Sequence, residues 1–447
     1  MRLTPSALAF ALLAAACAGG ATPATTSEPP RKAAPPDGSS ASAAPVSSTT
    51  PAASAPAVRD GATDPAAPEG SDPHADVKAA NAFTARLYGR VKKAPGNVMI
   101  SGTSVRHALA IATVGARGET AQEMSSALEL PAEPAKAAAL AKAETASWQE
   151  ARGKAELFVA NRLWTDKAFP LKADFTSAVD ATFGAAAEQV DFMHAPDVAR
   201  RAINTWSATM TAQKIPDLLP EGSIDKRTRV VVTNAIYFKG KWSSPFPSGA
   251  TKDEPFKAAA RTANVPMMHA TSSHRFAQVG AVKVLEMRYE TSQLAMLVVL
   301  PDDTAGLAKL EDGLSAEIFE TWTKALASQR VAITLPKFGF KWGLPLAAPL
   351  QELGIKSAFS PKADLSGIAD TPAGERLQIS QVMHKTWGAV DELGTEAAAS
   401  TGVAMSTTSL HMGPIADFKA DHPFLFFVYD AKKGRILFAG RVTDPKS

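Results

Sequence analysis

The sequence has 447 residues, of which 45% are hydrophobic and 20% charged, a composition typical of a globular protein with a sizeable core. The net charge of +3 is small and no dense basic run occurs, which argues against nucleic acid as a partner and leaves a weak polyanion site open. The single cysteine, Cys17, excludes an intramolecular disulfide and a cysteine-based zinc site.

Residues 1–17 have the features of an export signal. A short apolar run ends at Ala16 and is too short to span a bilayer. The segment Leu13–Cys17 resembles the lipobox of bacterial lipoproteins, in which the cysteine is lipidated, although Ala14 departs from the usual leucine. An ordinary cleaved signal that leaves the Cys17 thiol free is the alternative. We expect a secreted or cell-envelope protein, held to a membrane by a lipid if Cys17 is modified and facing the periplasm or the exterior.

Residues 18–74 consist almost entirely of Ala, Pro, Ser, Thr and Gly with scattered charges. Such a tract cannot bury enough apolar surface to offset the entropy lost on ordering. We expect a disordered tether that holds the folded part away from a membrane, with an inert spacer as the alternative. The folded domain is then expected over 75–447.

Helical periodicity opens this domain. Ala80, Phe83, Leu87 and Val91 recur at three- and four-residue spacing, which predicts an amphipathic helix. A second helix is expected over Thr103–Ala116.

Two further helices are expected before the strand-rich part. Thr120 and Glu123 form a capping-box pattern, which predicts a short helix that opens there. Another helix is expected near Asp197. The side chains that we expect on one side of it are Val198, Ile203, Trp206 and Met210.

Strand patterns dominate the rest of the domain. β-Branched or aromatic runs bounded by Gly, Pro or Asp are Val230–Trp242, Leu294–Leu300, Val331–Phe338, Phe424–Tyr429 and Arg435–Val442. Several are nearly continuous in apolar residues, which indicates strands buried on both faces. Helices early, strands later and no regular alternation predict the α+β class.

No common enzyme motif is present. The sequence lacks Gly-x-Ser-x-Gly, His-Glu-x-x-His and a phosphate-binding glycine loop. His269 and His274 lie close together, but their spacing matches no standard metal motif. A Ser–His–Asp triad assembled in space stays open, because triads are recognised by geometry. We therefore expect a protein that is not an enzyme and binds no metal.

The stretch Gly394–Leu410 consists mostly of small residues. No proline occurs between Pro372 and Pro414, although the chain has 32 prolines. A segment that later becomes a central strand must lack proline, because proline has no backbone donor. Every second residue would then face inward, and all of these are small: Thr395, Ala397, Ala399 and Thr401. A flexible loop or a short helix is the alternative, since Glu-Ala-Ala-Ala favours a helix.

The segment Glu392–Thr401, ELGTEAAAST, resembles the hinge of inhibitory serpins. Other serpin-like motifs follow in the family's order: Asn97–Ser104, Asn234–Trp242, Val265–Met268, Leu335–Phe338, Ala363–Gly367, His384–Lys385, Ala420–Phe424 and Leu437–Arg441. The resemblance runs from about Val77 to the C-terminus. It implies the serpin fold, in which helices surround three β-sheets and an exposed reactive loop can insert into the large central sheet.

Family roles carry over onto the matching positions. The hinge comprises Glu392, Gly394, Thr395, Glu396, Ala397, Ala398, Ala399, Ser400 and Thr401. The polar cluster under the central sheet, called the shutter, comprises Ser101, Ser104, Asn234 and His384. The breach, where the loop first inserts, comprises Trp242, Lys337 and Glu392, and a Lys337–Glu392 ion pair is implied. Gly102 stands where the family usually has proline. Without the resemblance, these residues would be interpreted as ordinary core and surface positions.

The resemblance implies an irreversible inhibitor of serine proteases. The protease attacks the loop to form an acyl-enzyme, and the cleaved loop inserts and drags the protease about 45 Å. Family spacing places the cleaved bond between Thr408 and Ser409, with Leu410 or Met412 possible if the register slides. The small Thr408 favours an elastase- or subtilisin-like target. A trypsin-like target is not expected, because the loop has no basic residue.

Two other functions stay open at this point. One is a non-inhibitory serpin that acts as a binding or carrier module. The other is a hydrolase with an unrecognised triad. The expected partner of the inhibitor is a serine protease, bound covalently by a monomer without a cofactor.

Overall fold

The computed structural model describes residues 73–446 except 185, 259–260, 373–374 and 396–413. All of these residues belong to the unit Thr63–Ser447. The signal with Cys17, the tether, hinge residues Glu396–Thr401 and the Thr408–Ser409 bond lie outside the described residues, so predictions about them stay predictions.

The described residues contain nine α-helices and two 3-10 helices, and their bounds follow. They are α1 (Pro73–Val91), α2 (Gly102–Gly115), α3 (Gly118–Leu128), α4 (Pro134–Arg152), α5 (Ala173–Phe183), α6 (Pro196–Met210), α7 (Leu307–Asp312), α8 (Ala316–Ala325), α9 (Ala347–Glu352), η1 (Ser248–Ala250) and η2 (Ser357–Phe359). The two helices predicted from periodicity are confirmed as α1 and α2.

The predicted capping box at Thr120 and Glu123 is wrong. Helix α3 begins at Gly118, two residues earlier, and no side chain caps its first turn. The Thr120 hydroxyl instead accepts a hydrogen bond from the amide of Asp364 at 3.0 Å. The Glu123 carboxylate accepts one from the amide of Ser357 at 2.6 Å. Both side chains therefore fix a distant segment and not their own helix.

Helix α6 confirms the helix predicted near Asp197, but its buried side differs from the predicted one. Ile203 is buried as expected, whereas Val198 is 57% exposed and Met210 is 42% exposed. The buried partners of Ile203 are Ala199 and Ser207. Trp206, also predicted on this side, is partly buried and packs against the same core as Ile203.

Fifteen strands lie within the described residues. They are β1 (Val98–Ile100), β2 (Glu156–Asp166), β3 (Ala187–Val190), β4 (Val230–Lys241), β5 (Lys252–Lys257), β6 (Thr262–Gln278), β7 (Val282–Arg288), β8 (Leu294–Pro301), β9 (Ala327–Pro336), β10 (Phe338–Pro345), β11 (Ile379–Val390), β12 (Gly394–Thr395), β13 (Ala416–Lys419), β14 (Phe424–Asp430) and β15 (Ile436–Val442). Each predicted strand is found, and the run predicted over Val331–Phe338 divides at Lys337 between β9 and β10.

The strands form two hydrogen-bonded sheets, where the resemblance implied three. One sheet has six strands in the order β10-β11-β12-β4-β2-β3, and the other has nine. The nine-stranded sheet is continuous because β6 is 17 residues long. Strand β6 pairs with β5 over Thr262–Met267 and with β7 over Arg275–Gln278. It therefore joins two groups of strands that would otherwise be separate. The α+β class is confirmed.

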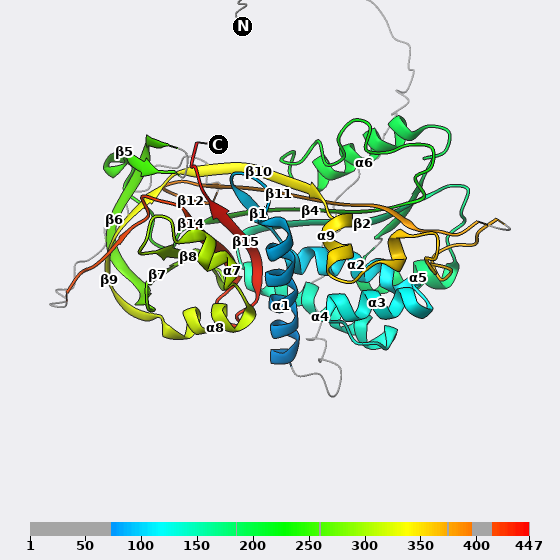
Figure 1. The fold of residues 1–447 in the computed structure, drawn as a ribbon, viewed down its shortest axis with the longest axis horizontal. Coiled ribbons are helices and arrows are strands. Elements are labelled where there is room, and N and C mark those ends of the chain that lie inside the picture. The colour runs from blue at the N-terminus through cyan, green and yellow to red at the C-terminus, as the bar shows by residue number, and fades with distance from the viewer. Residues whose placement is uncertain (1–72, 185, 259–260, 373–374, 396–413, 447) are drawn as a thin grey trace, which may run out of the picture. The chain divides into compact units, whose positions relative to one another are not determined.

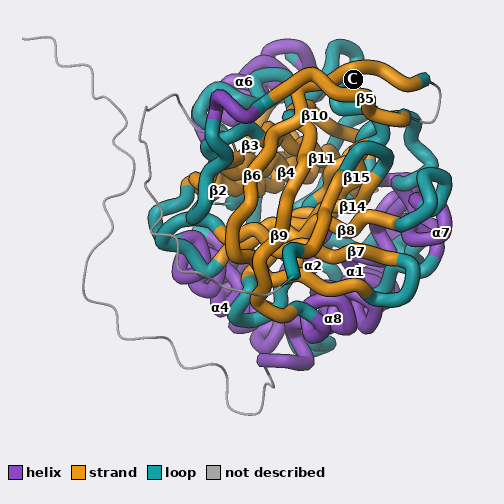
Figure 2. The backbone as a smooth tube through the Cα atoms, turned by 90° about the vertical axis from the view of Figure 1, so that its left-hand side faces the viewer, coloured by secondary structure: helices purple, strands orange, loops and turns teal. Residues whose placement is uncertain are grey.

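Helices cover both faces of the six-stranded sheet. Figure 1 shows α6 on one face and α2, α3, α4 and α5 on the other, and Figure 2 shows the strands in the middle with helices around them. The main apolar core lies between the two sheets and under α2, and a smaller one lies between the six-stranded sheet and α6. The sheet is therefore covered on both faces along β4, as this nearly continuous apolar strand requires.

A buried ion cluster joins the start of α1 to the core. Arg106 of α2 and Arg435 both contact Asp76 of α1, at 3.2 and 2.6 Å, and both contact Glu144 of α4, at 2.5 and 2.7 Å. Arg106 is fully buried. Two guanidinium groups and two carboxylates balance in charge, which is the condition under which buried charges are tolerated.

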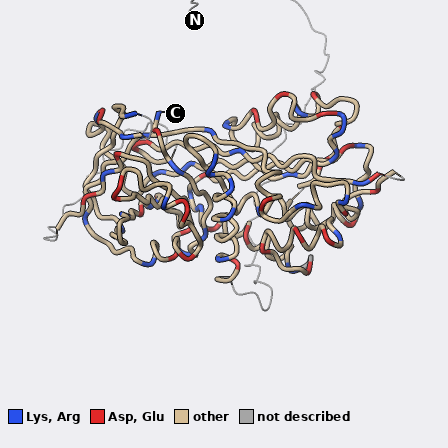
Figure 3. The backbone as a smooth tube through the Cα atoms, in the orientation of Figure 1, with Lys and Arg blue, Asp and Glu red and all other residues tan. Residues whose placement is uncertain are grey.

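Charges of both signs are interspersed over the described surface (Figure 3). Among the described residues, His, Cys, Asp and Glu side chains nowhere gather in threes in a way that could hold a metal ion. Within the same part of the chain, no helix combines the length and the apolar character needed to cross a membrane.

Candidate functional site

The hinge begins inside the six-stranded sheet. Strand β12 pairs antiparallel with β11 on one side, Thr395 opposite Val390. On the other side it pairs antiparallel with β4, Gly394 opposite Lys241 and Thr395 opposite Gly240. Beyond β12, β4 and β11 pair directly and in parallel, and we call this line of direct pairing the seam. Gly394 and Thr395 thus already form a short strand between β4 and β11.

Gly394 lies too close to β4 for any side chain. A Cβ atom on this residue would be 2.1 Å from the carbonyl oxygen of Gly240 and 2.7 Å from the Cα of Lys241. Backbone atoms cannot move away as a flexible side chain can. Glycine is therefore required where the chain turns into the sheet.

A tyrosine that sequence reasoning did not identify contacts Thr395 on the core side of the sheet. Its side chain faces the core at 4% exposure, and its hydroxyl shares a 2.8 Å hydrogen bond with the Tyr289 hydroxyl. The Tyr289 ring stacks on the ring of Trp242 at 4.6 Å and 16°. Burial raises the pKa of Tyr289 well above its usual value, so the phenol keeps its proton.

The predicted breach residues converge on the chain just before β12. The indole of Trp242 donates to the carbonyl of Asp391 at 3.0 Å, and its amide donates to the carbonyl of Leu393 at 2.8 Å. The structure also brings Lys337 and Glu392 together, with 2.8 Å between Nζ and Oε2. Thr251, which the sequence did not single out, donates to the other carboxylate oxygen of Glu392 at 2.8 Å.

The Glu392 carboxylate is held in its charged form. Burial raises its pKa, but the hydrogen bonds from Lys337 and Thr251 outweigh this effect, so the pKa lies below the usual 4.5. Because this pKa is lower in the folded protein than in the unfolded chain, the ionised carboxylate stabilises the fold at pH values above the unfolded-state pKa. That stabilisation is lost as the pH falls through the folded-state pKa. The contacts of Glu392 with Lys337 and Thr251 are therefore intact at neutral pH.

We expect Glu392→Gln to lower the free energy of unfolding by about 1 kcal/mol, because it removes a half-exposed ion pair and weakens two hydrogen bonds. Urea denaturation at pH 7 measures this. Glu156→Gln is the matched control, because Glu156 pairs with Lys239 at 2.9 Å on the neighbouring strands, away from the hinge. Equal losses in the two variants would contradict a special role for Glu392.

The predicted shutter residues meet under the seam. Asn234 of β4 donates from Nδ2 to Ser104 Oγ at 2.6 Å, and its Oδ1 contacts Nδ1 of His384 on β11. The amide of Ser101 donates to His384 Nε2 at 3.1 Å. Because Nε2 accepts, the single proton of a neutral ring lies on Nδ1 and points at Asn234. The side chains of Asn234 and His384 therefore link β4 and β11 across the seam.

Gly102, which departs from the family pattern, has a packing role. It is the first residue of α2 and follows the N-cap Ser101. A Cβ atom here would lie 2.5 Å from the Thr84 hydroxyl oxygen and 2.6 Å from the Thr84 Cα. The glycine therefore lets α1 pack closely against the beginning of α2.

The shutter network extends further than the sequence predicted. Asn161 of β2 accepts from Asn234 Nδ2, and its own Nδ2 lies 3.2 Å from His107 Nδ1. His107 Nε2 is 2.9 Å from the Thr145 hydroxyl on α4. No local pattern marks Asn161 or His107, because each occupies an ordinary inward position on its strand or helix. The network thus reaches from the seam to α4.

Both histidines of this network are neutral in the native protein. Burial lowers the pKa of His384 from 6.5 to about 3 and that of His107 to about 4. The native state then binds fewer protons than the unfolded state below pH 6.5, so stability falls as the pH falls from 6.5 toward these values. We expect urea denaturation at pH 5 to give a lower free energy of unfolding than at pH 7. His384→Gln should flatten this dependence, and an unchanged slope would contradict it.

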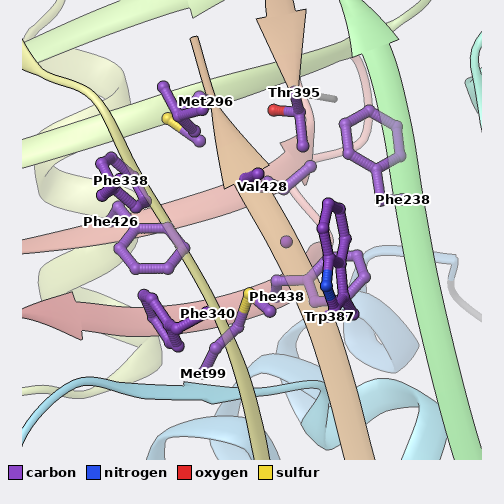
Figure 4. A pocket seen from close by; sticks show the side chains of 13 residues that line it. Met99, Phe238, Met296, Phe338, Phe340, Trp387, Thr395, Phe426, Val428 and Phe438 are labelled. Carbon is purple, nitrogen blue, oxygen red and sulfur yellow. The ribbon is translucent and has the colours of Figure 1, made fainter. Parts of the chain in front are cut away.

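A small apolar cavity lies beneath the point where β12 ends. Figure 4 shows Thr395 at one end of it, with aromatic side chains along its walls. The residues that line it include Met99, Phe238, Phe338, Phe340, Gly388, Val390, Phe426 and Phe438. An apolar space therefore lies next to the end of β12, on the core side of the sheet.

The chain is similar to known proteins over most of its length. The family model described as "Serpin (serine protease inhibitor)" matches residues 78–445. A leukocyte elastase inhibitor of Bos taurus is 39% identical over 359 residues, which cover 78% of this chain and 93% of the relative. The similarity thus covers nearly the whole length of that relative.

Solved structures show the same fold. A crystal structure of Serpin48, described as a highly specific serpin of the insect Tenebrio molitor, matches with a TM-score of 0.73 and 32% identity. The match covers 83% of this chain and 98% of that one. Human thyroxine-binding globulin matches with a TM-score of 0.76 and 25% identity over 83% of this chain and 99% of that one.

Proposed function

The chain belongs to the serpin family, and we propose that it is an irreversible inhibitor of serine proteases whose cleaved loop inserts along the seam. The observation that carries this proposal is β12, because Gly394 and Thr395 already pair with β4 and β11 as the start of an antiparallel strand. Insertion would extend that strand between β4 and β11.

The register of β12 supports insertion of the following residues. Continued along β4 from Thr395 opposite Gly240, it places Ala397 opposite Phe238. Continued along β11 from Thr395 opposite Val390, it places Ala397 opposite Gly388. Phe238 and Gly388 both line the apolar cavity, so the Ala397 methyl group would enter that space. A larger side chain would not fit there without rearrangement.

The same register brings Thr401 to the shutter. It lies opposite Asn234 when the pairing is continued along β4 and opposite His384 when it is continued along β11. Insertion separates Asn234 from His384 and would leave two buried polar groups without their partner. A threonine hydroxyl can donate and accept, so Thr401 can satisfy both. On insertion, the small Ala397 would thus face an apolar space and the polar Thr401 would face the polar shutter residues.

The chemical step is acyl transfer at the expected bond. The serine oxygen of the protease forms an ester with the carbonyl carbon of Thr408, the peptide bond to Ser409 breaks, and Ser409 leaves with a new protonated amino group. Insertion of the hinge then carries the ester-linked protease about 45 Å along the sheet. The protease is trapped if this movement precedes attack by water.

An elastase- or subtilisin-like enzyme is the proposed target. Thr408 is small, and the similar bovine protein is described as a leukocyte elastase inhibitor. The experiment is to incubate the protein with elastase-, subtilisin-, chymotrypsin- and trypsin-like proteases. A detergent-stable complex and a released fragment that begins at Ser409 are expected with the first two. Clean cleavage without a complex would overturn the proposal and favour the non-inhibitory binding or carrier alternative.

Thr408→Arg should move the specificity to trypsin-like proteases. An arginine at the cleaved bond supplies the charge that the acidic specificity pocket of trypsin requires. We expect a detergent-stable complex with trypsin that the parent does not form, and loss of the complex with elastase. Ser406→Arg is the matched control, two residues from the expected bond. A fragment that begins elsewhere than Ser409 would show that the register differs.

We also propose that the protein is exported and held at the cell envelope by a lipid on Cys17. The lipobox-like sequence before Cys17 supports this. Mass spectrometry of the mature N-terminus tests it, together with cell fractionation of Cys17→Ser. Release of this variant into the soluble fraction is expected, and an unmodified Cys17 in the parent would overturn the proposal.

A further inference from the structure

Three aromatic side chains form a row across the face of the six-stranded sheet that lies on the α6 side. Tyr237 of β4 lies opposite Phe158 of β2 and opposite Trp387 of β11. The Phe158 and Tyr237 rings stack with centroids 5.4 Å apart at 18°, and the Tyr237 and Trp387 rings meet edge-on at 5.5 Å and 67°. Only the second contact crosses the seam.

These rings lie on the opposite face from the shutter. Tyr237 follows Asn234 by three residues, and Trp387 follows His384 by three, so alternation turns both pairs to opposite faces. Trp387 accordingly packs with the smaller apolar core on the α6 side. The seam is therefore linked on its inner face by Asn234 and His384 and on its outer face by Tyr237 and Trp387.

A cation covers the tryptophan of this row. The Lys214 ammonium lies 4.8 Å from the centroid of the Trp387 ring. Lys214 belongs to the turn after α6, not to the sheet. Ring-to-ring and cation–ring contacts each stabilise by an amount worth a few-fold in an equilibrium or a rate. While the seam is closed, Trp387 thus contacts Tyr237 of β4 and Lys214 of the turn after α6.

Loop insertion must break the contact across the seam. The register of β12 continued along either neighbouring strand places Ala398 between Tyr237 and Trp387. One added strand moves β4 and β11 apart by about 4.8 Å, which takes the two rings out of contact. The Phe158–Tyr237 stack lies between β2 and β4 and is unaffected by a strand inserted on the other side of β4.

We propose that the Tyr237–Trp387 contact is a clasp that keeps the seam closed and limits the rate at which a strand inserts. The proposal rests on the inhibitor function above, and it assigns to Trp387 a positioning role in that mechanism. The clasp stabilises the closed sheet and not the inserted one. Its removal therefore speeds insertion, whereas loss of an ordinary packing contact would affect both forms alike.

The test measures insertion without a protease. Full-length protein is incubated with an acetylated peptide of sequence TEAAASTGVAMSTT, which corresponds to Thr395–Thr408, and the heat-resistant fraction is followed over time. We expect Trp387→Leu to take up the peptide about three- to tenfold faster than the parent. Trp387→Phe should be intermediate. Phe158→Leu, which loses an aromatic stack of similar geometry that does not cross the seam, should stay within about twofold of the parent.

Each outcome decides between the proposals. Equal acceleration in Trp387→Leu and Phe158→Leu would show general loosening of the sheet and overturn the clasp, as would an unchanged rate in Trp387→Leu. Peptide uptake in the expected order together with no protease complex would leave the clasp standing and overturn the inhibitor function. If no variant takes up the peptide while the parent stays folded, the seam does not open and both proposals fall.

Discussion

Thr395→Arg is expected to turn the inhibitor into a substrate. The Thr395 side chain is 4% exposed, faces the core and bonds to Tyr289, so we expect an arginine there to leave β12 in the uncut protein, and insertion would first have to bury its charge without an acidic partner. Burial of an unpaired charge costs several kcal/mol, and about 1.4 kcal/mol corresponds to a factor of ten in rate. Insertion should therefore slow by more than about a hundredfold, and hydrolysis of the acyl-enzyme would precede it.

Titration of a target protease with increasing amounts of inhibitor measures this partition. We expect the number of inhibitor molecules consumed per trapped protease to rise at least about tenfold for Thr395→Arg. Thr395→Ser is the matched control, since it keeps the hydroxyl for Tyr289 and should behave like the parent. If Thr395→Arg traps protease as efficiently as the parent, trapping does not depend on insertion of this residue.

Asn234→Ala is expected to have the largest effect on native stability. Asn234 is fully buried and contacts Ser104, Asn161 and His384 at once. Alanine would leave these groups buried without their partner, at a cost of about 1 to 3 kcal/mol for each group that finds no replacement. We expect the free energy of unfolding to fall by about 3 to 5 kcal/mol.

Urea denaturation at neutral pH, with the loop uncut, measures this loss. Asn264→Ala on β6 is the matched control, because Asn264 is an exposed strand residue and its replacement should change stability by less than about 0.5 kcal/mol. A loss in Asn234→Ala no larger than in the control would mean that water or neighbouring groups replace the missing amide.

The elements that carry the site could be predicted because their signal is local. The run from Val230 is nearly continuous in apolar residues, as a strand buried on both faces requires, and the structure has β4 there. The hinge was predicted from its small residues, its lack of proline and the family motif, and the structure describes its first residues up to Thr395. The Lys337–Glu392 contact followed from the resemblance, because neither residue has a local feature that points to the other.

The rest depends on partners that are distant in the sequence. Tyr289 reaches Thr395 across 106 positions, and Asn161 reaches Asn234 across 73. Thr120 and Glu123 have a capping pattern, yet their side chains bind a segment more than 200 positions away. The two-residue strand β12 also has no periodicity to detect. In each case the tertiary neighbours, not the local pattern, determine what the residue does.

The position of Gly394 and Thr395 in the sheet has a kinetic consequence. A strand that adds to a sheet must first find its register, and a slip of one residue would turn every inward side chain outward. Here that choice is already made in the uncut protein, and a slip would direct the Glu396 carboxylate into the core. In the proposed mechanism, insertion would then extend a strand whose first two residues are already paired. In that mechanism, the number of residues from Gly394 to the cleaved bond would set the length of the inserted strand, and the fixed start would set which of its side chains face inward.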